Sequence, residues 1–275
     1  MRKYRKSIDM DLAIKLYSIH ENVSEVARLL NCNDTTLGIR LKDFNIHVKK
    51  SKYKGFDEYY FHNIDTEAKA YFFGLLLADG NNYTKAHRII LSLSEVDVAI
   101  IEVFKKELNI GVPIKLNKTK DKNHKDRKYL QVNSKVMSQE LSKKGCVNAK
   151  SNILEYPYGV IPEHLENHFI RGVFDGDGSI STFYANNCLT SCFNITGNAP
   201  FLEEIKKVLV KNCNIFNVKL NKPKRYLNGT AMLSYGGNVN SLKIKDYLYK
   251  DATIFLKRKK EKFDSIVSKR YKSIT

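Results

Sequence analysis

The fold is decided by the stretch Phe72-Phe73-Gly74-Leu75-Leu76-Leu77-Ala78-Asp79-Gly80, whose design returns in Ile170-Arg171-Gly172-Val173-Phe174-Asp175-Gly176-Asp177-Gly178. Each stretch is largely apolar, has the length of a helix and ends in an Asp-Gly pair. Small residues stand four apart in both, as Gly74 and Ala78 do in the first, so each helix carries a flat stripe without bulky side chains. The pattern predicts two helices that pack backbone to backbone along these stripes.

In such a packing, Asp79 and Asp177 lie together at the carboxyl ends of the two helices. The negative end of each helix dipole and the neighbouring carboxylate both disfavour this placement. Asp-Gly pairs also form ordinary turns, but two pairs that each end a helix with a glycine stripe argue against that interpretation. A feature that lowers stability in two copies indicates a functional role.

Two close carboxylates on a cationic protein suit a divalent metal ion. Mg²⁺ accepts carboxylate, carbonyl and phosphate oxygens while it keeps several waters, and Mn²⁺ is the expected substitute. The last carbonyls of a helix lack partners within it, so the backbone oxygens of Ala78 and Gly176 are further candidate ligands. The ion would neutralise the Asp pair, activate a water and stabilise the leaving oxygen of a phosphodiester.

The composition favours a nucleic-acid partner. The chain has 275 residues, with 47 Lys and Arg residues against 29 Asp and Glu residues and a net charge of +18. A polyanion is the natural partner of such a chain, with nucleic acid ahead of an acidic membrane. The sequence contains no apolar run of membrane-spanning length and no signal peptide, so we expect a soluble intracellular protein, cytoplasmic or nucleoid-associated, with an organellar or phage-encoded origin left open. Its five cysteines include no Cys-x-x-Cys pair, which indicates reduced structural thiols.

Residues 1–48 have the spacing of a helix-turn-helix domain. Helices are expected over 10–19, 23–30 and 34–44, with Asn33 or Asp34 as the cap of the third. The inward residues are expected to be Leu12, Ile14, Leu16, Ile19, Val26, Ala27, Leu29, Leu30, Leu37, Ile39, Leu41 and Phe44. Thr35, Thr36 and Arg40 would then face DNA from the recognition helix. The alternative is a plain three-helix accessory domain, followed in either case by a basic linker over 49–55.

Residues 56–155 and 156–275 are interpreted as two copies of one α+β unit. Besides the Asp-Gly segments, Ile114-Lys115-Leu116-Asn117-Lys118-Thr119-Lys120 is matched by Val218-Lys219-Leu220-Asn221-Lys222-Pro223-Lys224. Two copies are too few for a solenoid, so we expect pseudo-twofold pairing within a monomer, with the Asp-ended helices on the axis.

The expected strands alternate between apolar and polar residues. Ile89, Leu91, Leu93, Ile114, Leu116, Leu130 and Val132 would point to the core in the first copy, and Leu189, Phe193, Ile195, Val218 and Leu220 in the second. A polar face can be merely solvated, but its recurrence in both copies and the net charge favour contact with DNA. The candidate contacts on this face and its basic loops are Arg88, Lys115, Asn117, Lys118, Arg127, Tyr129, Gln131, Asn194, Lys219, Asn221, Lys222, Lys224 and Arg225.

The two segments resemble the LAGLIDADG motifs of homing endonucleases, and the doubled layout resembles the single-chain members of that family. The resemblance covers residues 56–270 and includes the closing Leu256-Lys257-Arg258-Lys259-Lys260-Glu261-Lys262-Phe263. It implies an αββαββα unit in each half, two antiparallel sheets that form a saddle over DNA, and cleavage of both strands across the minor groove to leave short 3′ overhangs. Together with the small all-α N-terminal domain, the expected fold class is α+β.

The resemblance also implies roles for single residues. The family's metal-binding acid is the penultimate motif residue, which is Asp79 in the first motif and Asp177 in the second. An earlier Asp of the motif is replaced by Leu77 in the first copy and kept as Asp175 in the second, at a position that is not the metal ligand. Family members use one Lys from each half to organise water near the scissile phosphates. Lys150 and Lys259 match these, with Lys143, Lys144, Lys250 and Lys257 as competitors.

We therefore expect a monomeric, Mg²⁺-dependent, sequence-specific endonuclease of double-stranded DNA, to which the helix-turn-helix adds affinity. The alternative is a non-catalytic binder on the same scaffold, either an RNA maturase or a transcription regulator. Loss of the two acids would favour that alternative, yet both are present. The chain begins with Met1 and ends in Ser273-Ile274-Thr275 without a terminal His-Asn pair, so we do not expect an enzyme embedded in an intein.

Overall fold

A computed structural model describes residues 8–20, 23–46, 48, 55–119, 126–150, 153–185, 188–222 and 229–272 of the chain. The expected linker residues 49–54 lie outside the described residues. The chain divides into two units, Met1–Phe56 with Asn109–Gly111, and Asp57–Leu108 with Val112–Thr275. None of the helices described is long and apolar enough to cross a membrane.

Three short helices form the first unit: α1 (Met10–His20), α2 (Val23–Leu29) and α3 (Asp34–Asp43). Asn33 caps α3, because its side chain accepts a hydrogen bond from the backbone nitrogen of Thr36 at 3.0 Å. The core consists of Ala13, Tyr17, Val26, Ala27, Leu37 and Leu41.

The inward face of this unit differs in part from the expected one. Ala13 and Tyr17 lie four apart and centre the buried stripe of α1, while Ile14 and Leu16 pack only at its margin. Each helix buries only a narrow stripe of residues, and apolar residues that lie off this stripe are outside the core. The expected core positions that are exposed instead are Leu12, Ile19, Leu29, Ile39 and Phe44.

The first half of the second unit has the predicted order of elements. It contains α4 (Glu67–Ala78), β1 (Gly80–Tyr83), β2 (Arg88–Ser94), α5 (Val98–Glu107), β3 (Lys115–Asn117), β4 (Arg127–Asn133) and α6 (Lys135–Lys143). Its strands form one antiparallel sheet in the order β1-β2-β4-β3. Ile89, Leu91, Leu93, Leu130 and Val132 are buried as expected, because alternate residues of β2 and β4 face the helices.

Within the described residues, the second half repeats this order with one strand fewer and one helix more. It contains α7 (Glu166–Asp177), β5 (Gly178–Ala185), β6 (Cys188–Asn198), α8 (Ala199–Cys213), β7 (Thr230–Gly236), α9 (Asn238–Leu248) and α10 (Lys257–Lys272). The antiparallel order is β5-β6-β7. The α+β class, with two antiparallel sheets and a repeated order of elements, is thereby confirmed.

The strand expectations at the outer edges of both sheets are wrong in part. Leu116 is 40% exposed, and the other residues of β3 are exposed as well, so this short edge strand buries neither face. The expected strand over 217–221 is reduced to a single bridge between Asn221 and Met232, with Val218 and Leu220 half-buried. Among the described residues of this segment, Asn221 forms the bridge to the sheet edge, so alternating apolar and polar residues do not make a strand here.

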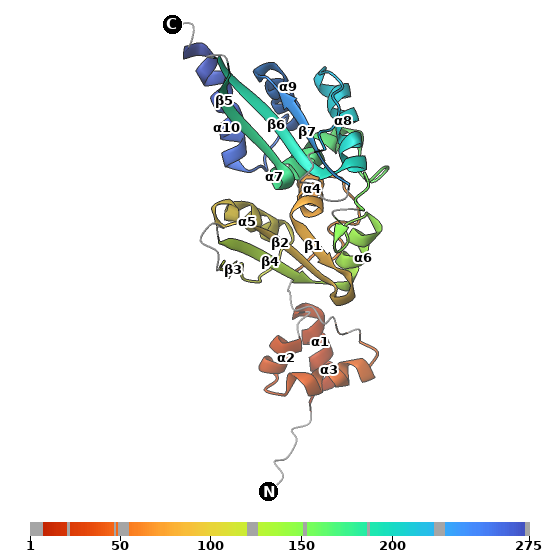
Figure 1. Ribbon diagram of the computed structural model, residues 1–275. Helices are drawn as coiled ribbons and strands as arrows, with labels where there is room; N and C mark the ends of the chain where they lie inside the picture. Colours follow the sequence, from red (N-terminus) through yellow and green to blue (C-terminus); the bar gives the residue numbers. More distant parts are fainter. Residues whose placement is uncertain are drawn as a thin grey trace. The chain divides into compact units, whose positions relative to one another are not determined.

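Helices α4 and α7 lie side by side between the two sheets (Figure 1). A methyl group on Gly74 would collide with the carbonyl of Phe169, and one on Gly172 would collide with the carbonyl of Tyr71. The glycine stripes therefore bring the two backbones into direct contact, as the sequence predicts. This contact joins the two halves and brings the ends of both motif helices to one place.

Candidate functional site

The two motif Asp residues stand where each helix passes into a strand. Asp79 is the last residue before β1, and its backbone nitrogen donates to the carbonyl of Leu75 at 2.9 Å. Asp177 ends α7, directly before β5. A methyl group on Gly176 would lie 3.3 Å from the backbone nitrogen of Asp79, so the two carboxyl ends meet. The expected juxtaposition of the two Asp residues is present.

Gly80 and Gly178 make this geometry feasible. A side chain on Gly80 would collide with the backbone of Leu76, and one on Gly178 would collide with Phe174. The chain can therefore turn from helix to strand within one residue at both positions. Each Asp therefore lies at the junction of its helix and its strand, with no loop between them.

The surroundings disfavour the ionised form of both carboxylates. Partial removal from water raises the pKa of Asp79, although Arg127 counteracts the rise through Nη2, which lies 3.4 Å from Oδ1 of Asp79. Partial removal from water and the charge of Asp79 raise the pKa of Asp177 to about 6. The side chain of Asp79 is 30% exposed and Asp177 is exposed, so both carboxylates remain accessible. Accessible acids with perturbed pKa values are typical of functional sites.

A buried lysine lies beside each Asp. Lys150 donates from Nζ to the carbonyl of Gly80, the residue after Asp79. Lys259 donates from Nζ to the carbonyl of Gly178, the residue after Asp177, at 2.6 Å. The exposed fractions of the two lysines are 7% and 4%, respectively. The same arrangement of Asp, Gly and Lys thus occurs twice.

Lys259 is held by two further carbonyls, those of Phe174 at 2.6 Å and Asp175 at 2.8 Å. Burial lowers the pKa of this ammonium group to about 8, although the Asp175 carboxylate opposes the change. The charges of Lys150 and Lys259 both favour the ionised forms of Asp79 and Asp177. Both lysines are therefore electrostatic partners of the acid pair.

The competing lysines have other partners or places. Lys143 and Lys144 pair with Glu140 at 2.7 and 3.4 Å, and Lys257 lies 3.7 Å from Glu261. Lys250 lies just after the carboxyl end of α9, where it lines a pocket. Of the candidates, the structure brings Lys150 and Lys259 to the Asp pair.

The donor set fits a hard divalent cation. Among the described residues, no cluster of three or more His, Cys, Asp or Glu side chains could hold a metal ion. The protein would offer the carboxylates of Asp79 and Asp177, with the carbonyls of Ala78 and Gly176 one residue before them. Mg²⁺ suits such a sparse set because it keeps several waters and takes substrate phosphates as ligands.

The open face of the first sheet carries long polar side chains. Arg88, Tyr129 and Gln131 lie on the face opposite the buried residues of β2 and β4, and Lys115 and Asn117 of β3 are exposed beside them. The guanidinium of Arg88 stacks on the Tyr83 ring, 4.7 Å from its centre. Nε2 of Gln131 donates to Oδ1 of Asn133 at 3.1 Å.

The second sheet differs from the expectation of a repeated polar set. Its three strands contain no Lys or Arg. The strand pairings of the two sheets can be matched by placing Gly178 on Gly80. Arg88 of the first sheet then corresponds to Cys192 of the second, and Gln131 corresponds to Ser234. Asn194 lies on this face and accepts a hydrogen bond from the Ser234 hydroxyl at 2.7 Å. Short side chains therefore stand where the first sheet has long ones.

The other expected DNA contacts lie outside the strands or in the first unit. Lys118, Lys219 and Lys222 are exposed, and Asn221 forms the single bridge to β7. Lys224 and Arg225 fall outside the described residues. On α3, Thr35, Thr36 and Arg40 are exposed together.

Sequence reasoning missed several buried polar residues near the site. Arg171 has no exposed surface, and Asn82 and Asn167 are 0% and 7% exposed. Asn167, Arg171 and Asp175 are polar residues spaced four apart along an otherwise apolar helix. That spacing places them on one face, which was a signal available in the sequence.

No family model and no curated protein matches the chain. Among solved structures, the LAGLIDADG homing endonuclease I-GzeII in complex with its DNA target matches with a TM-score of 0.51 and 13% identity, over 74% of this chain and 91% of that one. The LAGLIDADG homing endonuclease I-LtrWI, bound to target DNA, matches with a TM-score of 0.49 and 11% identity, over 74% and 89%. The chain has the LAGLIDADG homing endonuclease fold.

Proposed function

We propose that the chain is a monomeric, divalent-metal-dependent endonuclease that cuts both strands of double-stranded DNA at a specific site, across the minor groove. The observation that carries the proposal is the meeting of Asp79 and Asp177 at the ends of α4 and α7, each with a buried lysine on the next carbonyl. The net charge of +18 and the fold, which I-GzeII shows in complex with a DNA target, support it.

In this proposal Asp79 and Asp177 hold Mg²⁺, or Mn²⁺ in its place, with help from the carbonyls of Ala78 and Gly176. When bound, the ion supplies a water of lowered pKa and stabilises charge on the departing oxygen. Lys150 and Lys259 attract the phosphate charge and orient water, because their Nζ groups are fixed by backbone carbonyls.

Recognition of the DNA site belongs to the sheets and loops of the second unit. Arg88 and Gln131 carry hydrogen-bonding groups of the kind that read base edges in a major groove, while Lys115 and Lys118 suit phosphates. The short hydroxyl, thiol and methyl groups of the second sheet suit apolar contacts and single hydrogen bonds. The two halves would therefore read different sequences.

The test is cleavage of duplex DNA selected from a randomised library, with each strand labelled separately. Wild type cuts both strands with Mg²⁺ and neither with EDTA. Asp79→Asn and Asp177→Asn each lower the rate at least about a hundredfold, since each removes charge from the metal site. Asp246→Asn, a change of the same kind at an exposed position on α9, leaves the rate unchanged.

Single-Asp variants that cut both strands as well as wild type would falsify the proposal. A wild-type protein that binds RNA or DNA without cutting, and keeps that binding in both Asp variants, would instead support a maturase or a transcription regulator on this scaffold.

We further propose that residues 1–48 form a helix-turn-helix domain that adds affinity for flanking DNA, with Thr35, Thr36 and Arg40 on its recognition helix. These side chains are exposed together on α3. Arg40→Ala would lower the slope of log affinity against log salt by about one and leave cleavage of bound duplex unchanged. An unchanged slope would contradict a phosphate contact by Arg40.

A further inference from the structure

Three polar side chains on one face of α7 hold the segment that connects α9 to α10. Asn167, Arg171 and Asp175 are spaced four residues apart, and we call them the α7 ladder. The segment they hold runs from Tyr247 to Leu256. The contacts of the three members together extend over the segment from Tyr247 to Leu256.

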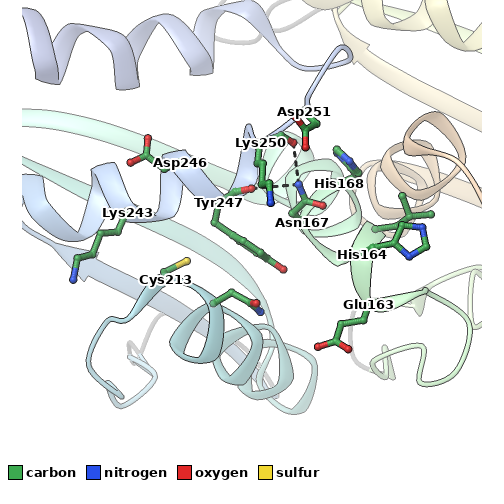
Figure 2. A pocket seen from close by; sticks show the side chains of 12 residues that line it. Glu163, His164, Asn167, His168, Cys213, Lys243, Asp246, Tyr247, Lys250 and Asp251 are labelled. Atoms are coloured by element: carbon green, nitrogen blue, oxygen red, sulfur yellow. Dashed lines mark hydrogen bonds between the residues drawn. The ribbon is translucent and has the colours of Figure 1, made fainter.

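Asn167 holds the end of α9. Its Nδ2 donates to the carbonyl of Tyr247 at 3.3 Å and to that of Lys250 at 3.1 Å. Figure 2 shows these two bonds at the edge of an open pocket of about 1090 Å³. The last carbonyls of a helix need such partners, because they have none within the helix.

Arg171 binds the segment at two separate points and has no exposed surface. It donates from Nε to the carbonyl of Ile254 at 2.9 Å and from Nη1 to that of Leu248 at 2.8 Å. Nη1 also donates to Nδ1 of His168 at 2.7 Å, so the His168 ring accepts as a neutral imidazole. Nη2 donates to Oε1 of Glu67 at 2.7 Å. A buried guanidinium with so many partners fixes its surroundings strongly.

Asp175 grips the far end of the segment. Its Oδ2 accepts from the backbone nitrogen of Leu256 at 2.8 Å and from the hydroxyl of Tyr71 at 2.8 Å. Tyr71 belongs to α4, so this grip already involves both halves of the unit. Asp175 is the motif position that Leu77 replaces in the first half.

Glu67 completes the arrangement from the first half. It lies in the first turn of α4 and accepts hydrogen bonds from the backbone nitrogens of Thr253 and Ile254 at 2.7 and 3.0 Å. The Thr253 hydroxyl donates to its other oxygen at 2.8 Å. The segment is therefore held between Glu67 on one side and the α7 ladder on the other.

The held segment leads directly to Lys259. The backbone nitrogen of Lys259 donates to the carbonyl of Leu256 at 3.0 Å, so the first turn of α10 starts from the residue that Asp175 holds. The Nζ of Lys259 then reaches the carbonyls of Phe174, Asp175 and Gly178. The position of the segment sets the position of this ammonium group.

Lys150 is reached by a different route. Asn82 of β1 donates from Nδ2 to the carbonyls of Cys146 and Ser138 at 2.8 and 2.9 Å, and Lys150 follows Cys146 in the chain. These residues all belong to the first half. On α4 the positions that match the α7 ladder are Lys69, Phe73 and Leu77, so the ladder has no copy there.

We propose that Glu67 and the α7 ladder are positioning residues for Lys259 and not for Lys150, so that the second lysine is set in place only when both halves are docked. The consequence for cleavage rests on the proposed nuclease function, whereas the positioning itself does not. A ladder that only stabilised the fold would affect both lysines alike.

The first test measures lysine acetylation by an N-hydroxysuccinimide ester, read at each lysine by mass spectrometry on the full chain without metal. In Asn167→Ala and Glu67→Gln, Lys259 is labelled about tenfold faster or more than in wild type, while Lys150 keeps its rate. Asn82→Ser is the matched control and gives the reverse, faster Lys150 and unchanged Lys259. Equal rates for Lys259 in all proteins, or equal rises at both lysines in Asn167→Ala and in Glu67→Gln, overturn the inference.

The second test follows each strand of the selected DNA duplex separately. Lys259→Ala identifies the strand that depends on this lysine. Asn167→Ala and Glu67→Gln slow the same strand by about tenfold to a hundredfold and leave the other within about twofold. Equal slowing of both strands overturns the inference. A wild-type protein that cuts no duplex contradicts the proposed function alone, since the acetylation result decides the positioning by itself.

Discussion

Nη2 of Arg127 lies 3.4 Å from Oδ1 of Asp79, whereas the register of the second sheet puts Thr230 at the position that matches Arg127. Arg127 also donates from Nε to the hydroxyl of Ser92 at 3.1 Å, which holds the guanidinium beside β2. The two halves thus give their acids different neighbours. Arg127, which the sequence singles out as a DNA contact, is also an electrostatic partner of Asp79.

Replacing Arg127 should raise the pKa of Asp79. Partial removal from water raises the pKa of Asp79, and the Arg127 guanidinium counteracts this rise by stabilising the ionised carboxylate. Arg127→Gln removes the counteracting charge. Carbon-13 NMR of the carboxyl groups in metal-free buffer should show Asp79 titrating at higher pH in the variant than in wild type. Arg88→Gln, on the same face but stacked on Tyr83, is the control and should leave Asp79 unchanged. A lower or unaltered Asp79 pKa in Arg127→Gln contradicts the contact.

Asp177 should lower stability at neutral pH. Its folded-state pKa of about 6 lies above its ordinary value, so the folded state binds its proton more tightly than the unfolded chain does. The stability that this tighter proton binding contributes is fully present below about pH 4. This contribution is lost as the pH rises to 6 and above. Without metal, Asp177→Asn should therefore be more stable than wild type by about 1 kcal/mol at pH 7.5, since exposure screens the full effect. Urea unfolding at pH 4 should show almost no difference, and an equal gain at both pH values would exclude this origin.

The contact between α4 and α7 should not tolerate a methyl group. Gly172→Ala would press a methyl against the carbonyl of Tyr71, and neither backbone can withdraw without separating the helices. We expect a loss of about 3 kcal/mol or more in the free energy of unfolding, measured with urea and circular dichroism. Gly236→Ala, where a new methyl meets nothing within 4 Å, should change it by less than about 0.5 kcal/mol. Similar values for both variants would mean that the helices are not in backbone contact.

The two sheets should contribute unequally to DNA affinity. Arg88→Ala and Gln131→Ala each remove a long hydrogen-bonding side chain, and each should weaken binding of the selected duplex by about 1 to 3 kcal/mol. Cys192→Ala and Ser234→Ala change the matched positions of the second sheet and should have effects below about 0.5 kcal/mol. Fluorescence anisotropy in metal-free buffer measures all four, and equal losses on both sheets would contradict the asymmetry.

The sequence predicts the features that depend on local pattern. Small residues four apart and a terminal Asp-Gly pair define a helix stripe and its end, so the meeting of Asp79 and Asp177 follows from spacing alone. The alternation in β2 and β4 likewise predicts the buried Ile89 and Leu130, because both strands have one face on the core. Lys150 and Lys259 came from the family resemblance, since many lysines compete in a chain this basic.

Features that depend on distant partners were beyond the sequence. Alternation near Leu116 and Val218 looks like that of a core strand, but a sheet edge buries neither face fully there. Arg171 meets Glu67 across the two halves, and no local pattern pairs residues so far apart in the chain. The correspondence of single positions in the two sheets, such as Arg88 and Cys192, required the strand pairing that only the structure supplies.

Along the stripes of α4 and α7, at Gly74 and Gly172, the two backbones touch with no side chain between them, so main-chain geometry largely sets the gap between Asp79 and Asp177. The sheet surfaces lie outside this gap and can change their residues without altering it. A graft of one half onto a half from another protein with the same stripes should therefore preserve the carboxylate spacing and alter only the surface presented to a ligand. The architecture separates the part that must stay constant from the part that is free to diverge.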